Sequence, residues 1–413
     1  MSRRKSQEEP PVRRASAGVA VIALLGAIAF VNAMGATIVF PLGPFLARDL
    51  GVPLQEAALA STLYTAAAGI GGLAGALFLG RWSRRGALMA SLGGLGLGML
   101  AAGLAPDFRW LLLARFLSGL CAGPLMAAVV TIAAEAVSED RRGRVVSAIV
   151  GSYGLALVLG LPFALLLSAS AGGWRIPVLT LGAAYLLLLL PVWRMLPPAT
   201  GAAAGLRVTP ASLLRLLLRG ESLTGLALIA AASFASLLLA PNLSAFALGN
   251  AGVSEAGLRG IYLLGGAAAL VTTRVTGWVM DRIGTLQASL TVAVVLSLLL
   301  VASFLLPMPA VAAVPLLGLV LAAQLARSTV AQASAVRVAQ PAERMTYQCL
   351  VAAATSLGQA GGSACSTLVL RETPGGGLWG MGWLAGLSIA LAWLAPLLVV
   401  LLDRQLRARE PVH

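Results

Sequence analysis

The segment "GWVMDRIG", residues 277–284, places an aspartate and an arginine at the end of a long apolar run. The segment "ALFLGRWSRR", residues 76–85, ends an earlier apolar run and carries three arginines. Charged residues are rare in this chain, because 59% of its 413 residues are hydrophobic and only 11% are charged. Two charged turns at matching places between apolar runs therefore indicate a repeated arrangement of helices.

The composition is that of a membrane protein. The mean hydropathy is +0.92, whereas a soluble domain has about 45–50% apolar and about 25% charged residues. The chain has too little polar surface to cover a water-soluble globule. Its apolar runs are about 20 residues long, which is the length that crosses a hydrocarbon core of about 30 Å. These features predict an all-α membrane protein that crosses the membrane many times.

Hydropathy predicts twelve membrane spans. The runs lack the alternation of a lipid-facing strand, so helices are favoured over a barrel. The first run is too long for the core of a signal peptide, and residues 1–17 are therefore expected to be a soluble tail. The predicted spans are residues 18–43, 57–80, 87–105, 110–134, 145–168, 175–196, 222–246, 258–280, 286–307, 311–338, 346–369 and 378–402.

The chain divides into two halves of six spans each. Between them a linker, residues 197–221, begins with a proline pair and contains Thr209-Pro210, a signal for the start of a short amphipathic helix. The predicted domains are an N-terminal bundle at 18–196 and a C-terminal bundle at 222–402, followed by a tail at 403–413. Matching loops, "SEDRRGR" and "PAERMTY", follow the fourth span of each half. Such an internal repeat predicts a substrate site between the halves.

The distribution of basic residues predicts the orientation. Most of the 29 lysines and arginines lie in segments on the same side as the N-terminus. By the positive-inside rule both termini are expected in the cytoplasm, with the protein in the inner membrane. This bias also explains the net charge of +14. The basic residues form no continuous patch, so no nucleic-acid partner is expected.

The sequence offers little for catalysis. Its single histidine is His413, and its single lysine is Lys5. The three cysteines lie in apolar spans without metal-ligand spacing, and no phosphate-binding loop of the G-x-x-x-x-G-K-[ST] type occurs. We therefore expect no enzyme activity, no catalytic residues, no metal, no cofactor and no transport driven by ATP in this chain alone.

Several motifs together resemble those of the major facilitator superfamily. The family pattern G-x-x-x-D-R-x-G-[RK]-[RK] is matched at Gly277, Asp281, Arg282 and Gly284, and in part by the earlier turn. The fourth span begins "RFLSGLCAG", which matches R-x-x-x-G, and the fifth contains "GLALVLGLPFALLL" followed by "GWR". This combination is similar to the drug and arabinose efflux branch. The resemblance implies two pseudo-symmetric six-helix bundles that transport a substrate by alternating access.

The two charged turns are predicted to act in gating. Arginines of the first turn could pair with carboxylates such as Glu135 at the end of the fourth span, and so latch one conformational state. The alternative is that these arginines only set the topology. The predicted gating residues are Arg81, Arg84, Arg85, Glu135, Gly277, Asp281, Arg282 and Gly284.

Arginines within the membrane are the most informative charges. An arginine at the centre of a span costs about 2.5–3.5 kcal/mol on insertion scales, so Arg327 should face a cavity or a partner. It either binds an anionic or polar group of the substrate from the central cavity, or it bonds to the carbonyls of a neighbouring helix. Gln324 adjoins it one helical turn away. Arg115 lies nearer the outer end of the fourth span.

Neutral polar and aromatic residues complete the predicted cavity. Few polar groups among apolar walls suit a small amphipathic molecule, although helix packing explains each residue equally well. The candidates are Asn32, Phe40, Tyr64, Arg115, Tyr153, Phe234, Asn242, Tyr262, Gln324, Arg327 and Gln359.

The predicted function is secondary transport of a small amphipathic or anionic molecule, with efflux favoured by the branch resemblance. The alternatives are an uptake or lipid-moving carrier of the same fold, and a membrane scaffold or sensor that transports nothing. No carboxylate lies within a span, so the sequence does not decide whether protons are the coupling ion. Asp49 and Glu135 are the candidate proton carriers. A monomer surrounded by membrane lipids is expected.

Overall fold

A computed structural model describes residues 11–78, 83–135, 137, 145, 149, 152–196, 209–340 and 343–409. Within this part of the chain the regular secondary structure is helical except for one short hairpin. Eleven helices or helix pairs are long and apolar enough to cross a membrane. Their outer surfaces expose large apolar side chains, such as Leu187 at 74% and Trp383 at 72%. A lipid environment suits such surfaces, which would be unfavourable in water.

The N-terminal half contains the first six spans. The first consists of α1 (Pro11–Thr37) and α2 (Val39–Leu50), which is followed by a 3₁₀ turn, η1 (Leu54–Ala58). The next three are α3 (Leu59–Phe78), α4 (Arg84–Gly103) and α5 (Phe108–Glu135). The fifth combines α7 (Ser152–Leu155), a π-helical segment η3 (Ala156–Gly160) and α8 (Leu161–Ala171), and the sixth consists of α9 (Arg175–Leu187) and α10 (Leu189–Met195).

The C-terminal half repeats this plan. A short helix, α11 (Pro210–Leu217), precedes the seventh span, which consists of α12 (Gly220–Leu239), the 3₁₀ turn η4 (Ala240–Asn242) and α13 (Leu243–Gly249). The others are α14 (Glu255–Ile283), α15 (Thr285–Phe304), α16 (Ala310–Val336), α17 (Arg344–Val369) and α18 (Met381–Arg409). Between the last two, β1 (Arg371–Glu372) and β2 (Leu378–Trp379) pair antiparallel, with Arg371 opposite Trp379.

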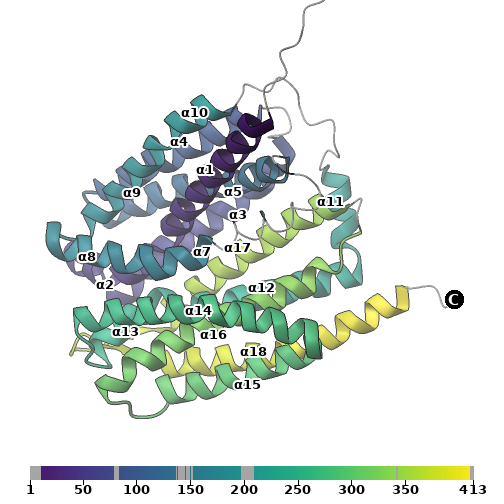
Figure 1. Cartoon of the computed structure of the whole chain (residues 1–413). Coiled ribbons are helices and arrows are strands. Elements are labelled where there is room, and N and C mark those ends of the chain that lie inside the picture. The colour runs from purple at the N-terminus through teal and green to yellow at the C-terminus, as the bar shows by residue number, and fades with distance from the viewer. Residues whose placement is uncertain are drawn as a thin grey trace, which may run out of the picture.

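The two halves form two helical bundles that lie side by side (Figure 1). The N-terminal bundle is purple to blue-green, and the C-terminal bundle is green to yellow. We call the end that carries α2, α8 and α13 the distal end, and the end that carries α11 and the last turns of α18 the proximal end. The bundles converge at the distal end and spread apart toward the proximal end.

All twelve predicted spans overlap helices, but four of them are divided into shorter elements, and the breaks of the first and seventh spans correspond between the two halves. The first is interrupted at Ile38 and the seventh at Ala240–Asn242. Pro41 and Pro241 explain both breaks, because proline has no N–H to donate to the carbonyl four residues earlier. The breaks occupy matching places in the two halves and turn α2 and α13 toward each other at the distal end.

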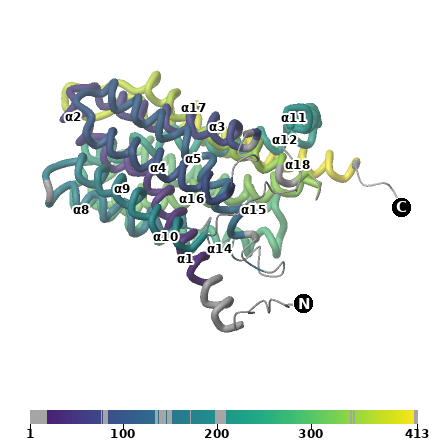
Figure 2. Tube along the Cα trace, turned by 90° about the horizontal axis from the view of Figure 1, so that it is seen from above, coloured from purple at the N-terminus to yellow at the C-terminus, as the bar shows by residue number. Residues whose placement is uncertain are grey.

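The eleventh span, α17, is not among the eleven helices counted above, because it is less apolar than they are. Its buried polar residues include Ser363 and Ser366, both 0% exposed. It packs against α12 within its own bundle and against α3 of the other bundle, and Figure 2 shows α3 and α17 running alongside each other. Because so much of its surface meets protein, this helix does not need the apolar faces of a lipid-exposed span.

The short helix α11 lies within the segment predicted to be the linker. The side chain of Thr209 accepts a hydrogen bond from the N–H of Ser212, whose hydroxyl caps the N–H of Thr209 in return. Leu216 is 3% exposed and packs into the C-terminal bundle. Just beyond the helix, Arg219 pairs with both carboxylate oxygens of Glu343, at 2.6 and 2.9 Å. The rest of the linker, residues 197–208, lies outside the described residues.

Candidate functional site

The candidate site is the interface between the two bundles. At the distal end, hydrogen bonds cross this interface: the Ser363 hydroxyl donates to the carbonyl of Ala58 at 3.0 Å, and the N–H of Leu54 donates to the carboxylate of Glu372 at 2.9 Å. The broken spans meet there through α2 and α13. These contacts close the distal end of the interface.

Deeper in the membrane the bundles meet through glycines. Gly266 of α14 lies against the π-helical segment of the fifth span, and an added Cβ would be 2.6 Å from the nitrogen of Val158. On the same span, a Cβ at Gly154 would be 2.8 Å from the Leu270 side chain. Gly160 faces inward instead, toward Met34 of α1. The glycine-rich motif of the fifth span therefore permits close packing both within its bundle and against the other bundle.

Arg115 lies inside the N-terminal bundle and is 1% exposed. Its guanidinium donates to the carbonyls of Gly35 at 2.8 Å and Ala60 at 3.4 Å, and its carbon lies 4.1 Å from the centre of the Tyr64 ring. Gly119, one turn later, lets α3 approach, because a Cβ there would be 2.3 Å from the carbonyl oxygen of Tyr64. The R-x-x-x-G motif thus joins three helices around one buried cation.

Arg327 lies inside the C-terminal bundle and is 2% exposed. It donates to the carbonyl of Ala232 and to the hydroxyl of Ser236 on α12, both at 3.1 Å, and to the hydroxyl of Ser388 on α18 at 3.4 Å. This placement agrees with the alternative in which the arginine bonds to neighbouring helices. Gln324 is buried nearby, and within the described residues neither atom of its amide has a hydrogen-bond partner.

The contacts of Arg327 predict an unusual order of stability among its variants. In Arg327→Met, Ser236 can keep its own bond to the Ala232 carbonyl at 3.0 Å, so removing the charge leaves few polar groups unsatisfied and should cost less than about 2 kcal/mol. Arg327→Lys keeps a buried charge without the planar set of donors and should cost about 2–4 kcal/mol. Thermal melting in detergent checks this order, and a lysine variant as stable as the wild type would contradict it.

The structure does not bring all the predicted cavity residues together. Tyr64 joins Arg115 in one bundle, whereas Arg327 and Gln324 lie in the other. Asn242 donates to Ser366 at 2.9 Å, and the Tyr262 hydroxyl bonds to Ser244 at 2.8 Å, so both are satisfied within the C-terminal bundle. The remaining candidates are partly or fully buried on separate helices: Asn32 on α1, Phe40 on α2, Tyr153 on α7, Phe234 on α12 and Gln359 on α17.

Sequence reasoning missed Tyr185. This side chain is 0% exposed, donates to the carbonyl of Val31 at 3.1 Å, and fills the space beside Gly35. It is one of only five tyrosines in the chain and stands alone in an apolar run. A lone tyrosine in an apolar run was the signal available in the sequence, because a buried phenol usually needs a hydrogen-bond partner.

The predicted gate is only partly described. Arg81 and the side chain of Glu135 lie outside the described residues. Arg85 donates to the carbonyl of Leu196 at 3.3 Å and lies over the Trp193 ring, while Arg84 is half-buried. In the second turn, Asp281 is exposed and forms no hydrogen bond or ion pair with any described residue. The latch therefore stays a prediction.

The glycines and arginine of the second turn have distinct places. Gly284 ends α14 with φ of +98°, a backbone conformation that residues with a side chain rarely adopt. Gly277 has open space around it, and Arg282 lies 5.6 Å from the centre of the Trp278 ring. The second motif glycine is thus required by the turn itself.

Asp49 forms the main ionic contact of the distal end within the N-terminal bundle. It pairs with Arg175 and accepts a hydrogen bond from the indole N–H of Trp174 at 2.9 Å. These contacts, first the indole bond and then the arginine, lower the pKa of Asp49 below its ordinary value. The "GWR" of the fifth-span motif therefore anchors the distal end of α2.

Comparison with known proteins decides the family. The sequence model of the Major Facilitator Superfamily matches residues 25–328. This chain belongs to that superfamily of membrane transporters. A solved structure described as a bacterial homolog to the human lysosomal transporter Spinster, in an inward-facing and unoccupied conformation, shares the fold with a TM-score of 0.69 at 14% identity, over 98% of this chain and 100% of that one.

Two curated members of the superfamily are similar in sequence. A "Chloramphenicol resistance protein" of Streptomyces lividans is 28% identical over 363 residues, which covers 85% of this chain and 89% of that protein. "Chloramphenicol efflux pump Rv0191" of Mycobacterium tuberculosis is 31% identical over 140 residues, which is 33% of this chain and 34% of that pump. The chain is thus a multi-pass transporter of small molecules with relatives among efflux pumps.

Proposed function

We propose that this protein is a secondary active transporter that exports a small amphipathic or anionic molecule by alternating access. The observation that carries the proposal is the interface itself. It is closed by inter-bundle bonds at the distal end, while the bundles spread apart toward the proximal end (Figure 1). Two packed bundles that meet through small residues can rock against each other about a central site.

The direction of transport is inferred from the relatives. One is named a chloramphenicol resistance protein and another a chloramphenicol efflux pump, and both names support export. An uptake or lipid-moving carrier would share the same bundles. A scaffold or sensor would not need the close glycine contacts between bundles, which allow movement without side-chain interlocking.

The orientation follows from the basic residues. Among the described residues most arginines lie toward the proximal end, and this end is proposed to face the cytoplasm, with the protein in the inner membrane. The distal end, closed in this structure, would then face outward. Substrate would enter from the cytoplasmic side and leave when the distal contacts open.

Transport by purified protein in vesicles tests the proposal. Chloramphenicol, other lipophilic drugs and organic anions would be added to the medium around inside-out vesicles, with and without a pH gradient across the membrane. The proposal predicts protein-dependent accumulation of at least one of these compounds. Equal uptake by vesicles with and without the protein, across all three classes and all gradients, would contradict it.

The gate can be tested at Asp281. Because its carboxylate is exposed and has no partner among the described residues, Asp281→Asn should leave folding nearly unchanged, within about 0.5 kcal/mol. We expect it to shift the balance of conformations, since the carboxylate would be paired only in the other state. Distances between spin labels on the two bundles measure this balance. If both the distances and transport match the wild type, Asp281 has no gating role.

Coupling can be tested at Asp49. The indole and guanidinium contacts keep its pKa low, so the carboxylate stays ionised near neutral pH. The ion pair contributes stability above the ordinary aspartate pKa of about 3.9, and that contribution is lost as the pH falls through the lowered value. Asp49→Asn should therefore leave any response to a pH gradient intact, as should the control Glu56→Gln. Loss of the response in Asp49→Asn alone would make Asp49 the proton carrier.

A further inference from the structure

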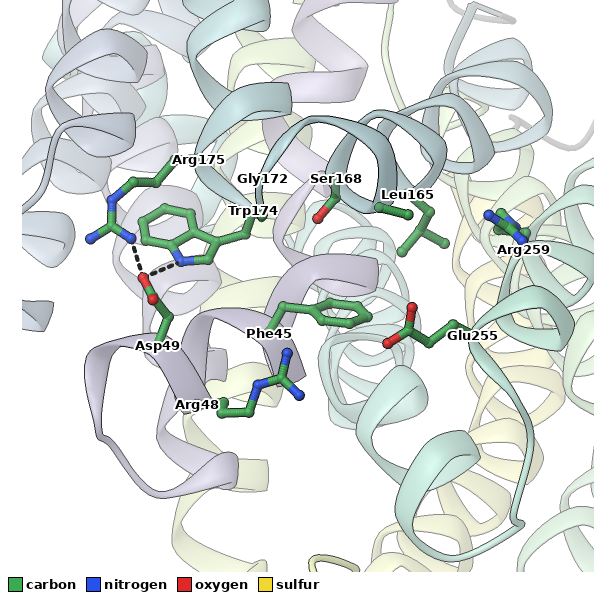
Figure 3. Close-up of a pocket in the computed structure, with 12 residues that line it drawn as sticks. Phe45, Arg48, Asp49, Leu165, Ser168, Gly172, Trp174, Arg175, Glu255 and Arg259 are labelled. Atoms are coloured by element: carbon green, nitrogen blue, oxygen red, sulfur yellow. Dashed lines mark hydrogen bonds and ion pairs between the residues drawn. The ribbon is translucent and has the colours of Figure 1, made fainter.

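A cavity of about 510 Å³ lies at the distal end, between the two bundles. Figure 3 shows its walls: α2, α8 and the start of α9 from the N-terminal bundle, and the start of α14 from the C-terminal bundle. Its volume falls within the range of about 300–1,000 Å³ that is common for small-molecule sites. None of the residues that line it takes part in the glycine contacts between the bundles, so it is distinct from the proposed transport site.

The charges in this cavity fall into two groups. Asp49 and Arg175 neutralise each other on one side. Arg48 from α2 and Glu255 from α14 belong to opposite bundles, and neither forms a hydrogen bond or ion pair with any described residue. In Figure 3 their charged ends point toward each other beside the Phe45 ring. The cavity therefore offers a cation from one bundle and an anion from the other, with space left between them.

The other residues that line the cavity are partly apolar and partly polar. Phe45 and Leu165 provide apolar surface, Ser168 provides a hydroxyl, and Arg259 adds a second cation one turn after Glu255. On the same helix as Leu165, the side chains of Phe163 and Leu166 are 59% and 50% exposed. A ligand with acyl chains could lie along this helix while its polar head occupies the cavity.

We propose that this cavity binds the headgroup of an aminophospholipid. The phosphate fits the arginine, because a guanidinium presents parallel donors that match two phosphate oxygens. The primary ammonium fits Glu255, since it can donate hydrogen bonds to the carboxylate. A ligand held by both Arg48 and Glu255 joins the two bundles, and its binding favours the closed distal end by its higher affinity for that state.

The test is lipid binding by the purified full-length protein, measured by native mass spectrometry in detergent. Phosphatidylethanolamine, phosphatidylcholine and phosphatidylglycerol are added separately. We expect phosphatidylethanolamine to be retained most strongly, because only its headgroup combines a phosphate with a primary ammonium. Arg48→Gln and Glu255→Gln should each weaken its retention about tenfold, as expected for the loss of one charged hydrogen-bond pair. Arg109→Gln, an exposed arginine outside the cavity, is the matched control.

The outcomes are distinct. Equal retention of phosphatidylethanolamine and phosphatidylcholine would overturn the role of the ammonium, and wild-type retention by both cavity variants would overturn the site. Both substitutions are at sites open to solvent, so melting temperatures close to that of the wild type are expected. Binding of free O-phosphoethanolamine tests whether the ligand is a lipid or a soluble molecule. If this compound binds tightly while the lipid does not, the ligand is soluble and the lipid assignment is wrong. If transport proves absent, lipid retention still decides this proposal.

Discussion

Replacing Gly119 with leucine is expected to remove most of the folded protein. A Cβ at this position would lie 2.3 Å from the carbonyl oxygen of Tyr64 and 2.9 Å from the Cβ of Ala67. The first of these atoms belongs to backbone, which cannot rotate away, so α3 and α5 would have to separate. Separation would also pull Arg115 from the Ala60 carbonyl and the Tyr64 ring. Overpacking alone costs about 1–3 kcal/mol, and the weakened arginine contacts add to that cost.

The measurement is the yield and melting temperature of the variant in detergent. Gly93→Leu is the matched control, because it places the same side chain in the middle of a helix where a Cβ would meet nothing within 4 Å. The control should fold with nearly normal yield. A Gly119→Leu variant that melts like the control would show that the contact between α3 and α5 is looser than described.

Replacing Gly266 with leucine is expected to abolish transport but to leave both bundles folded. The atoms nearest to an added Cβ are all in Val158, and two of them are backbone atoms of the opposite bundle, at 2.6 and 2.7 Å. The substitution therefore blocks the approach of the bundles without crowding the interior of either one. The arrangement with the distal end closed would become unfavourable, and a cycle that must pass through it should slow at least about tenfold.

Two measurements test the predicted effect of Gly266→Leu: transport in vesicles, and the distances between spin labels across the distal end. Gly386→Leu is the control, since a Cβ at Gly386 meets nothing within 4 Å. Gly266→Leu should show longer distal distances, and the control should match the wild type. Normal transport by Gly266→Leu would mean that this contact is not needed in the cycle.

The sequence was sufficient to predict the helices because their signal is local. Each span is a run of apolar residues of the right length, and Thr209-Pro210 marks a helix start wherever it occurs. The breaks at Ile38 and Pro241 were also encoded locally. Within such long apolar runs, however, a proline indicates a kink or a break without saying which, since neighbouring helices decide how the freed carbonyl is satisfied.

The positions of the charged side chains could not be predicted in the same way. Periodicity shows that Arg327 needs a partner, but not whether the partner is a substrate or the Ala232 carbonyl and the Ser236 hydroxyl. That choice depends on how α16 is rotated against α12, which is determined by the packing of the whole C-terminal bundle. The site at the distal end was missed for the same reason: Arg48 and Glu255 are more than two hundred residues apart in the sequence, and only the packing of the bundles brings them to one cavity.

The most direct test of alternating access is a reversible cross-link across the distal end. Ala58→Cys and Ser363→Cys would be combined in a protein whose own cysteines, Cys121, Cys349 and Cys365, are replaced, because the Ser363 hydroxyl lies 3.0 Å from the Ala58 carbonyl. Transport of chloramphenicol, or of whichever compound the vesicle screen yields, is then measured before oxidation, after it and after reduction. The account predicts that oxidation stops transport and reduction restores it. Undiminished transport by fully cross-linked protein would contradict it, because the substrate could then leave without the distal end opening.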